Sequence, residues 1–256
     1  MELLRYRELL YMLVVRDIKI KYKQSIMGFM WAILMPMVIV LAGIVVKKAI
    51  AVFSGREMEL ADVVTVSVKS LPWAFFVGAL RFSTNSLLSN RSIVTKIYFP
   101  KEVCPLAAVL SSFFDFFIAS LALTFFLVIV GVGVSPYLLW VPVLLILMFG
   151  LTAGMGMIFS CANLFFRDVK YIVEIILTFA IFFTPVFYEA SNFKKWENII
   201  LLNPIAPILE GFNSAIVLHQ SPELDWIGYS AVWSIAGLYI AWIIFFRMEH
   251  KFAEHI

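Results

Sequence analysis

Charged side chains are scarce in this sequence. Only 14% of the 256 residues are Asp, Glu, Lys or Arg, while 62% are hydrophobic and the mean hydropathy is +0.96. A soluble domain is about half apolar and a quarter charged, so lipid rather than water must surround most of this chain. The formal net charge of +3 is small, and no long Lys/Arg tract is present. We therefore expect an integral membrane protein with membrane lipid around it and no nucleic acid among its partners.

The sequence also lacks the patterns on which catalytic sites are built. It contains no GxxxxGK[ST], HExxH or GxSxG motif, and its histidines, His219, His250 and His255, are scattered. We expect no catalytic residue, no metal site, no cofactor and no ATP hydrolysis on this chain. The two cysteines, Cys104 and Cys161, are predicted to be free thiols near the cytoplasmic side, because a disulfide would be unusual in that reducing compartment.

Long apolar runs divide the chain into predicted membrane spans. A spanning helix needs about 20 apolar residues, and six segments come near that length: about 28–46, 72–88, 106–131, 138–165, 169–188 and 226–246. The first follows a basic run, Lys19, Lys21 and Lys23, which is typical of the cytoplasmic side of a bilayer. With this orientation the cytoplasmic segments hold 13 Lys and Arg residues and the outer loops hold 6, although Lys47 and Lys48 count against it. The prediction is one all-α domain, 1–256, with six spans and both termini in the cytoplasm.

Apolar residues also recur at helical spacing before the first span. Within residues 1–24 they fall at Leu3, Tyr6, Leu10, Leu13 and Val14. This pattern predicts an amphipathic helix lying in the cytoplasmic membrane interface. Residues 18–23 alternate apolar and basic side chains with a strand period, which leaves the end of that helix open.

The connection before the last span contains short apolar pieces. Each apolar stretch within residues 195–218 is too short to cross a bilayer, and Asn203-Pro204 and Pro207 interrupt these stretches. Short helical pieces between two full spans favour a re-entrant hairpin dipping into the outer leaflet. A compact extracellular cap is the alternative.

Three charged residues fall clearly inside the predicted spans. Intramembrane charges are costly and are usually paired. Arg81 and Asp115 are expected at comparable depth on neighbouring helices, which predicts a structural ion pair, with a proton relay as the alternative. Glu174 follows Lys170 by four residues, so these two are expected to pair along one helix face.

A second cytoplasmic segment, residues 90–100, is predicted to form a short helix. Asn90 is able to cap its start and Pro100 would end it. Ile93, Ile97 and Tyr98 are apolar yet lie outside the membrane. They are expected either to pack on the N-terminal helix or to dock into a soluble partner.

Aromatic residues make up 16% of the chain and gather at the entry of the first span and along the fifth. They form either a lipid-facing stripe, the usual role of such residues, or a stacking surface for sugar rings. With the interspersed threonines, these candidate path-lining residues are Phe29, Trp31, Thr178, Phe179, Phe182, Phe183, Phe187 and Tyr188.

Several motifs in order resemble one family of membrane transporters. The start of the chain, with Arg16-Asp17, Tyr22, Ser25, Gly28, Trp31 and Pro36, is similar to the ABC-2 permeases that export lipid-linked polysaccharides such as O-antigen and teichoic acid. Further likeness in residues 91–105, at Arg167-Asp168, in 184–188 and at Asn203-Pro204 extends the resemblance over most of the chain.

This resemblance implies a permease of the inner (cytoplasmic) membrane that works with a separate nucleotide-binding ATPase subunit in two copies. It implies that the ATPase docks on a coupling helix and that the first and fifth spans border the polysaccharide path. One protomer is too small to enclose such a path, so a homodimer is expected. The alternatives are a membrane-embedded glycan or lipid transferase and an ion-coupled flippase. The expected coupling residues are Arg91, Ser92, Ile93, Val94, Thr95, Lys96, Ile97 and Tyr98.

Overall fold

The computed structural model describes residues 6–23, 27–53, 55 and 57–255, and helices dominate this part of the chain. The elements in order are α2 (Arg7–Tyr22), α3 (Met30–Phe53), α4 (Leu60–Thr84), α5 (Ser86–Ser89), α6 (Arg91–Lys96), α7 (Val103–Val130), η1 (Pro136–Leu139), α8 (Trp140–Phe165), α9 (Val169–Ala180), η2 (Ala190–Trp196), α10 (Glu197–Leu201), α11 (Ala206–Ile216) and α12 (Leu224–His255). No strand occurs within these ranges. The all-α prediction is therefore confirmed.

Five helices of the described chain are long and apolar enough to cross a membrane. They are α3, α4, α7, α8 with the turn η1 before it, and α12. These correspond to five of the six predicted spans. The remaining segment, 169–188, is not one continuous helix, because α9 stops at Ala180 and turns follow it. Pro185 lies in those turns and has no N–H to continue a helical ladder. The count of six spans is thus not confirmed.

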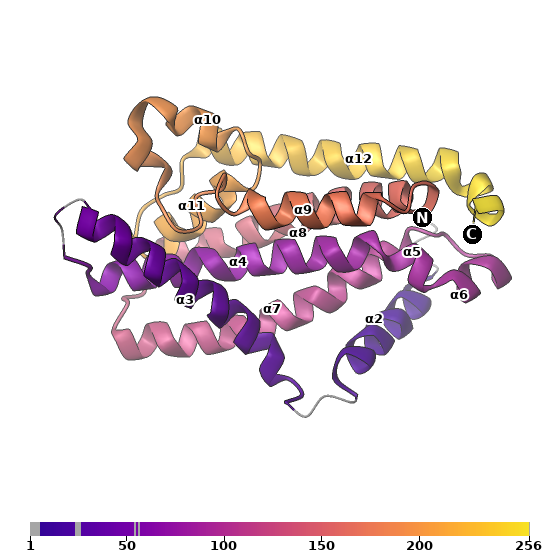
Figure 1. Ribbon diagram of the computed structural model, residues 1–256, viewed down its shortest axis with the longest axis horizontal. Helices are drawn as coiled ribbons and strands as arrows, with labels where there is room; N and C mark the ends of the chain where they lie inside the picture. The colour runs from indigo at the N-terminus through magenta and orange to yellow at the C-terminus, as the bar shows by residue number, and fades with distance from the viewer. Residues whose placement is uncertain (1–5, 24–26, 54, 56, 256) are drawn as a thin grey trace.

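Helix α4 lies at the centre of the bundle (Figure 1). It packs against α3, α7, α8, α9 and α11, and most of its surface is buried. Its side chains Leu71, Phe75, Phe76 and Leu80 belong to the largest apolar core of the protein. The other spans expose broad apolar faces, which is what a lipid environment requires of helices around a central one.

Two predicted spans begin or end at charged residues in the sequence but continue through them in the structure. Helix α3 includes Lys47 and Lys48, and α4 includes Lys69. Both Lys47 and Lys69 are buried. Each is neutralised by a carboxylate from elsewhere in the chain, Lys47 by Asp62 at 2.9 Å and Lys69 by Glu210 at 3.0 Å. The lysines that counted as outer-loop charges therefore lie within helices.

Helix α2 joins the bundle at the end that holds α6 and the end of α12 (Figure 1). Leu13 is buried in a second apolar cluster, on which Tyr6, Leu10 and Val14 also pack, while Leu3 lies outside the described residues. The helix continues to Tyr22, so the strand-like period of residues 18–23 is not realised. Its place in the membrane interface remains a prediction.

The segment predicted as a re-entrant hairpin contains two helices, α10 and α11. They lie at the end of the bundle opposite α6 (Figure 1). Helix α11 contacts α4, α8 and α12, and Ile208, Leu209 and Phe212 are buried in the main core. A helical hairpin is therefore an integral part of the bundle. Its insertion into the outer leaflet remains a prediction.

Candidate functional site

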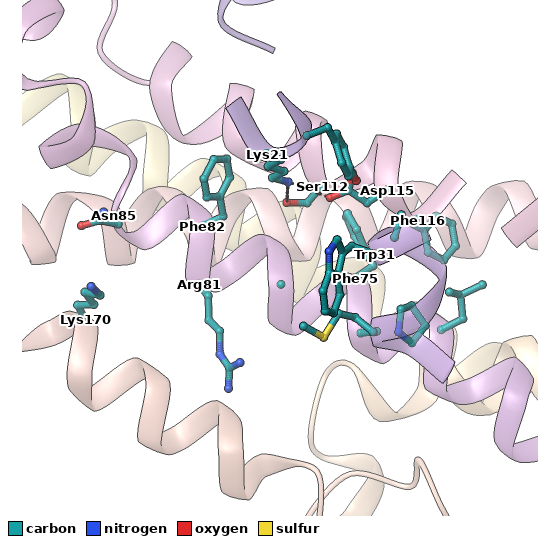
Figure 2. Close-up of a pocket in the computed structure, with 17 residues that line it drawn as sticks. Lys21, Trp31, Phe75, Arg81, Phe82, Asn85, Ser112, Asp115, Phe116 and Lys170 are labelled. Atoms are coloured by element: carbon teal, nitrogen blue, oxygen red, sulfur yellow. Dashed lines mark hydrogen bonds and ion pairs between the residues drawn. The ribbon is translucent and has the colours of Figure 1, made fainter. Parts of the chain in front are cut away.

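A cavity of about 560 Å³ opens beside the central helix. We call it the cationic pocket. Its walls come from the end of α2, the start of α3, one face of α4, the middle of α7 and the start of α9 (Figure 2). Three of its side chains are cations, Lys21, Arg81 and Lys170, and one, Asp115, is a carboxylate. Sequence positions up to 149 residues apart thus meet in one place.

A stripe near the C-terminal end of the mostly buried helix α4 forms one wall of the pocket. It includes Ala74, Gly78, Arg81 and Phe82, with Asn85 directly after the helix, and these residues recur at helical spacing and therefore share a face. Gly78 and Arg81 are exposed, and a Cβ atom on Gly78 would meet no atom within 4 Å. The small residues keep this wall open.

Asp115 is held on the opposite wall by the end of α2. Lys21 places its ammonium 2.9 Å from the Asp115 carboxylate and 4.6 Å from the centre of the Phe82 ring. The Tyr22 hydroxyl donates a hydrogen bond to the other carboxylate oxygen. Burial, together with this hydrogen bond to a negative group, raises the pKa of Tyr22, so the hydroxyl keeps its proton. The end of α2 is therefore fastened to α7.

The expected ion pair between Arg81 and Asp115 is wrong, although both residues line the pocket. Helix α4 ends at Thr84, which places Arg81 about one turn from its C-terminal end rather than deep within it. Arg81 instead donates to the Thr178 hydroxyl of α9 at 3.2 Å, and Lys21 takes its place at Asp115. This arrangement also removes the basis for a proton relay between the two.

The pair expected between Lys170 and Glu174 does not form within ion-pair distance in the described chain. Thr178 donates its hydroxyl proton to the Glu174 carbonyl oxygen at 2.7 Å. The Lys170 backbone N–H donates to the Asn163 side chain at 3.2 Å, and its ammonium lies 5.9 Å from the Tyr171 ring centre. The ammonium of Lys170 therefore faces the pocket without a carboxylate.

The candidate path-lining residues do not form one surface. Trp31 lines the cationic pocket, whereas Phe29 lines a separate groove along α2 and stacks on Tyr22 with ring centres 4.5 Å apart. Phe187 is only 6% exposed and packs against Gly43 of α3, so its predicted role as a lining residue does not fit this structure. Tyr188 is half-buried and donates its hydroxyl proton to the Phe182 carbonyl. The remaining candidates on α9 and the turn after it are exposed: Thr178, Phe179, Phe182 and Phe183.

The predicted coupling segment folds as the short helix α6 followed by a turn. Val94 is buried and Ile93 packs on the second apolar cluster, so these two residues hold α6 on the bundle. Ile97 and Tyr98 are 55% and 86% exposed, although both are large and apolar. The remaining predicted residues of the segment are also exposed: Arg91, Ser92, Thr95 and Lys96. The turn therefore offers an apolar tip surrounded by polar side chains.

Sequence reasoning missed a charge network at the other end of the bundle. The Lys69 ammonium is fully buried and donates to Glu210 at 3.0 Å and to the Tyr188 carbonyl at 2.7 Å. Nearby, Lys47 contacts Asp62 at 2.9 Å and Glu189 at 3.3 Å. The sequence signal was a lysine close to a long apolar run, because a lysine that is buried there needs a partner.

Comparison with known proteins shows similarity to one family of transporters. The model of the family described as "ABC-2 type transporter" matches residues 8–217. A relative from Myxococcus xanthus is 27% identical, over 100% of this chain and 98% of its own length. Two relatives from Klebsiella pneumoniae are 27% and 25% identical, each over 96% of this chain and 94% of its own length. All three are named O-antigen export system permease protein RfbA.

The matched region begins in α2 and continues through α11, so it includes the cationic pocket, the coupling segment and the helical hairpin. The match covers far more than half of the chain and includes every described helix before α12. This chain belongs to the ABC-2 type transporter family and is a multi-pass membrane component of a transporter, not an enzyme.

Proposed function

We propose that this protein is the permease subunit of an exporter that moves a lipid-linked polysaccharide, O-antigen or a related cell-surface glycan, outward across the inner membrane. The observation that carries this proposal is the similarity, over 96–100% of the chain, to permeases named for O-antigen export. A relationship that spans every helix of the fold includes the parts that bind cargo as well as those that bind the motor.

The energy for export comes from an ABC ATPase subunit, a partnership that the family implies. We propose two ATPase copies, each docked on the Ile97–Tyr98 turn of one permease. Exposed apolar tips on soluble surfaces mark sites of protein contact, and this tip is fixed to the bundle by the buried Val94. Movement of the ATPase would therefore be passed through α6 to α5 and from there to α4, since α6 contacts α5 and α5 contacts α4. Because the ATPase is proposed to dock at α6, the end of the bundle that holds α6 and the end of α12 is proposed to face the cytoplasm (Figure 1).

A homodimer is proposed to complete the path. On α4 the lining of the cationic pocket runs from Leu71 to Asn85, about half the length of that helix. Helix α3, helix α9 and the turn after α9 present exposed aromatic residues, among them Trp31, Phe179 and Phe183. A second copy facing these helices would enclose a conduit with aromatic walls, on which sugar rings are able to slide by weak stacking contacts.

Docking is tested with a double substitution in the turn, Ile97→Asp together with Tyr98→Asp. Both side chains are exposed, so the fold should be retained, whereas Ile93 and Val94 are unsuitable because they pack inside. The matched control is Ile199→Asp, an equally exposed apolar residue on α10 at the other end of the bundle. The variants are expressed with the ATPase subunit in cells that lack the native permease.

The double variant should lose most of the co-purifying ATPase subunit and most of the polysaccharide detected by antibody on the cell surface. The Ile199→Asp control should keep both. Full retention of the ATPase and of surface polysaccharide by the double variant would show that the turn is not the coupling contact. Unchanged polysaccharide on the surface of cells that lack the permease would contradict the proposed function.

A further inference from the structure

The charges of the cationic pocket do not balance. Of its three cations, Lys21 is neutralised by Asp115. Neither Arg81 nor Lys170 has a carboxylate within ion-pair distance among the described residues. The pocket therefore carries two positive charges that no carboxylate of the described residues compensates.

An uncompensated cation beside a membrane span is costly, and such residues usually meet a partner. The Arg81 guanidinium carries five N–H donors, and its one hydrogen bond goes to the neutral Thr178 hydroxyl. Figure 2 shows Arg81 extending from α4 towards α9, with Lys170 on α9 beside the same space. Donors and charge are thus present for an anion that the described part of the chain does not supply.

The part of the pocket between α3 and the middle of α4 is apolar. Leu71 and Phe75 line it from α4, and Met35 and Pro36 line it from α3. Leu71 and Phe75 lie six to ten residues further from the inner end of α4 than Arg81, which is about 9–15 Å along the helix. The pocket therefore has a cationic mouth near the inner end of the span and an apolar interior further into the bundle.

We propose that Arg81 and Lys170 form a subsite for the phosphate group of a phosphate-bearing lipid, whose first apolar segment lies along Gly78 towards Phe75. A guanidinium fork matches phosphate oxygens in pairs, and an ammonium adds a point charge. The open wall at Gly78 gives the chain room beside α4. This inference rests on the proposed function, because the lipid carrier of the exported glycan is the ligand that we assign to it.

The binding test uses the full-length permease with its ATPase subunit in nanodiscs of phosphatidylcholine. The probe is farnesyl diphosphate, compared with farnesol and with inorganic diphosphate, and the measured quantity is the dissociation constant. Arg81→Gln and Lys170→Gln should each weaken farnesyl diphosphate binding about tenfold or more, since each removes a charge-assisted hydrogen bond. Arg81→Lys should recover part of the affinity. The control Lys195→Gln removes an exposed lysine at the other end of the bundle and should change nothing.

A second variant tests the apolar part without altering charge. Gly78→Leu fills open space, so it should leave the fold intact. It should weaken farnesyl diphosphate binding but leave inorganic diphosphate binding unchanged. Unchanged affinity for farnesyl diphosphate in the combined Arg81→Gln and Lys170→Gln variant would overturn the proposal, as would equal binding of farnesol and farnesyl diphosphate.

Competition by phosphatidylglycerol identifies the source of the phosphate. If farnesyl diphosphate stays bound in a large excess of phosphatidylglycerol, the result supports the glycan carrier as the ligand. If phosphatidylglycerol readily displaces farnesyl diphosphate, the result supports the phosphate subsite and assigns it to membrane phospholipid. The surface-polysaccharide assay separates this inference from the proposed function. If the wild-type protein exports polysaccharide but the Arg81 and Lys170 substitutions leave farnesyl diphosphate binding unchanged, the subsite is overturned and the proposed function is not. If farnesyl diphosphate binding needs Arg81 and Lys170 but the wild-type protein exports no glycan, the proposed function is overturned and the subsite is not.

Discussion

Replacing Glu210 by Gln removes the carboxylate that neutralises Lys69. The Lys69 side chain is completely buried, and its ammonium has two partners, Glu210 at 3.0 Å and the Tyr188 carbonyl at 2.7 Å. Glu210 also accepts the Ala190 backbone N–H at 2.9 Å. Without the carboxylate, the buried ammonium keeps only one neutral acceptor.

Breaking a buried ion pair by removing one partner costs about 3–5 kcal/mol. Glu210 is partly exposed, with a side-chain exposure of 21%, so solvent lowers this cost. Gln also retains an oxygen that is able to accept the Ala190 N–H. We therefore expect Glu210→Gln to lower the free energy of unfolding by about 2–3 kcal/mol, which corresponds to a fall in Tm of about 5–10 °C for a chain of this size.

The assay is thermal or denaturant unfolding of the purified protein in one detergent. Glu223→Gln is the control, because Glu223 is an exposed carboxylate that lines the same outer hollow as Glu210 and makes no ion pair with the described chain. The double variant Lys69→Met with Glu210→Gln should regain part of the lost stability, since the uncompensated ammonium is gone. Equal Tm values for Glu210→Gln, Glu223→Gln and wild type would refute this reasoning about the buried pair.

Two further predictions concern packing and pH. Gly154→Ala should lower the free energy of unfolding by about 1–3 kcal/mol, because its Cβ would lie 2.7 Å from the Gly237 backbone, whereas Gly237→Ala, whose Cβ meets nothing within 4 Å, should be tolerated in the same unfolding assay. The raised pKa of Tyr22 means that its hydrogen bond to Asp115 stabilises the fold fully below the unfolded pKa of about 10 and is lost as the pH rises through the higher folded value. The stability difference between wild type and Tyr22→Phe should therefore shrink above that pH, while Tyr98→Phe, which alters an exposed ring, should differ little from wild type throughout.

Long apolar runs were sufficient to predict most of the fold. Helices α7 and α8 coincide closely with the predicted spans 106–131 and 138–165, because both helices are apolar along nearly their whole length. Helix α12 contains the predicted span 226–246 and continues through charged residues to His255. The helical spacing of Tyr6, Leu10, Leu13 and Val14 likewise predicted α2 correctly.

The predicted helix bounds were wrong where a distant carboxylate neutralises a lysine inside the helix. The predicted second span began at 72 because Lys69 interrupts the apolar run, yet α4 begins at Leu60. Glu210, which neutralises Lys69, lies 141 residues away in the sequence. No local pattern reports such a pairing. The same reason explains why α3 continues past Lys47 to Phe53.

Three residues of the cationic pocket could be singled out from the sequence, but neither the pocket nor the contacts of these residues could be predicted. Arg81, Asp115 and Trp31 were singled out, and all three line the cationic pocket. Their contacts depend on the packing of α2 against α7, which brings Lys21 to Asp115 and leaves Arg81 facing α9. The fifth span was overextended because residues 181–188 remain apolar after the helix has ended at Ala180. Composition alone does not distinguish an apolar turn from an apolar helix.

The central claim is that this chain conducts a lipid-linked polysaccharide when its ATPase partner hydrolyses ATP. The most direct measurement reconstitutes the permease and the ATPase subunit in proteoliposomes loaded with lipid-linked O-polysaccharide. Movement is followed by the loss of glycan from the leaflet that faces the ATPase and its appearance on the other side, scored by an impermeant glycosidase.

We predict transfer that requires ATP and that is abolished by a hydrolysis-deficient ATPase subunit and by the Ile97→Asp and Tyr98→Asp double variant. Transfer at the same rate without ATP, or no transfer with both subunits active, would contradict the account.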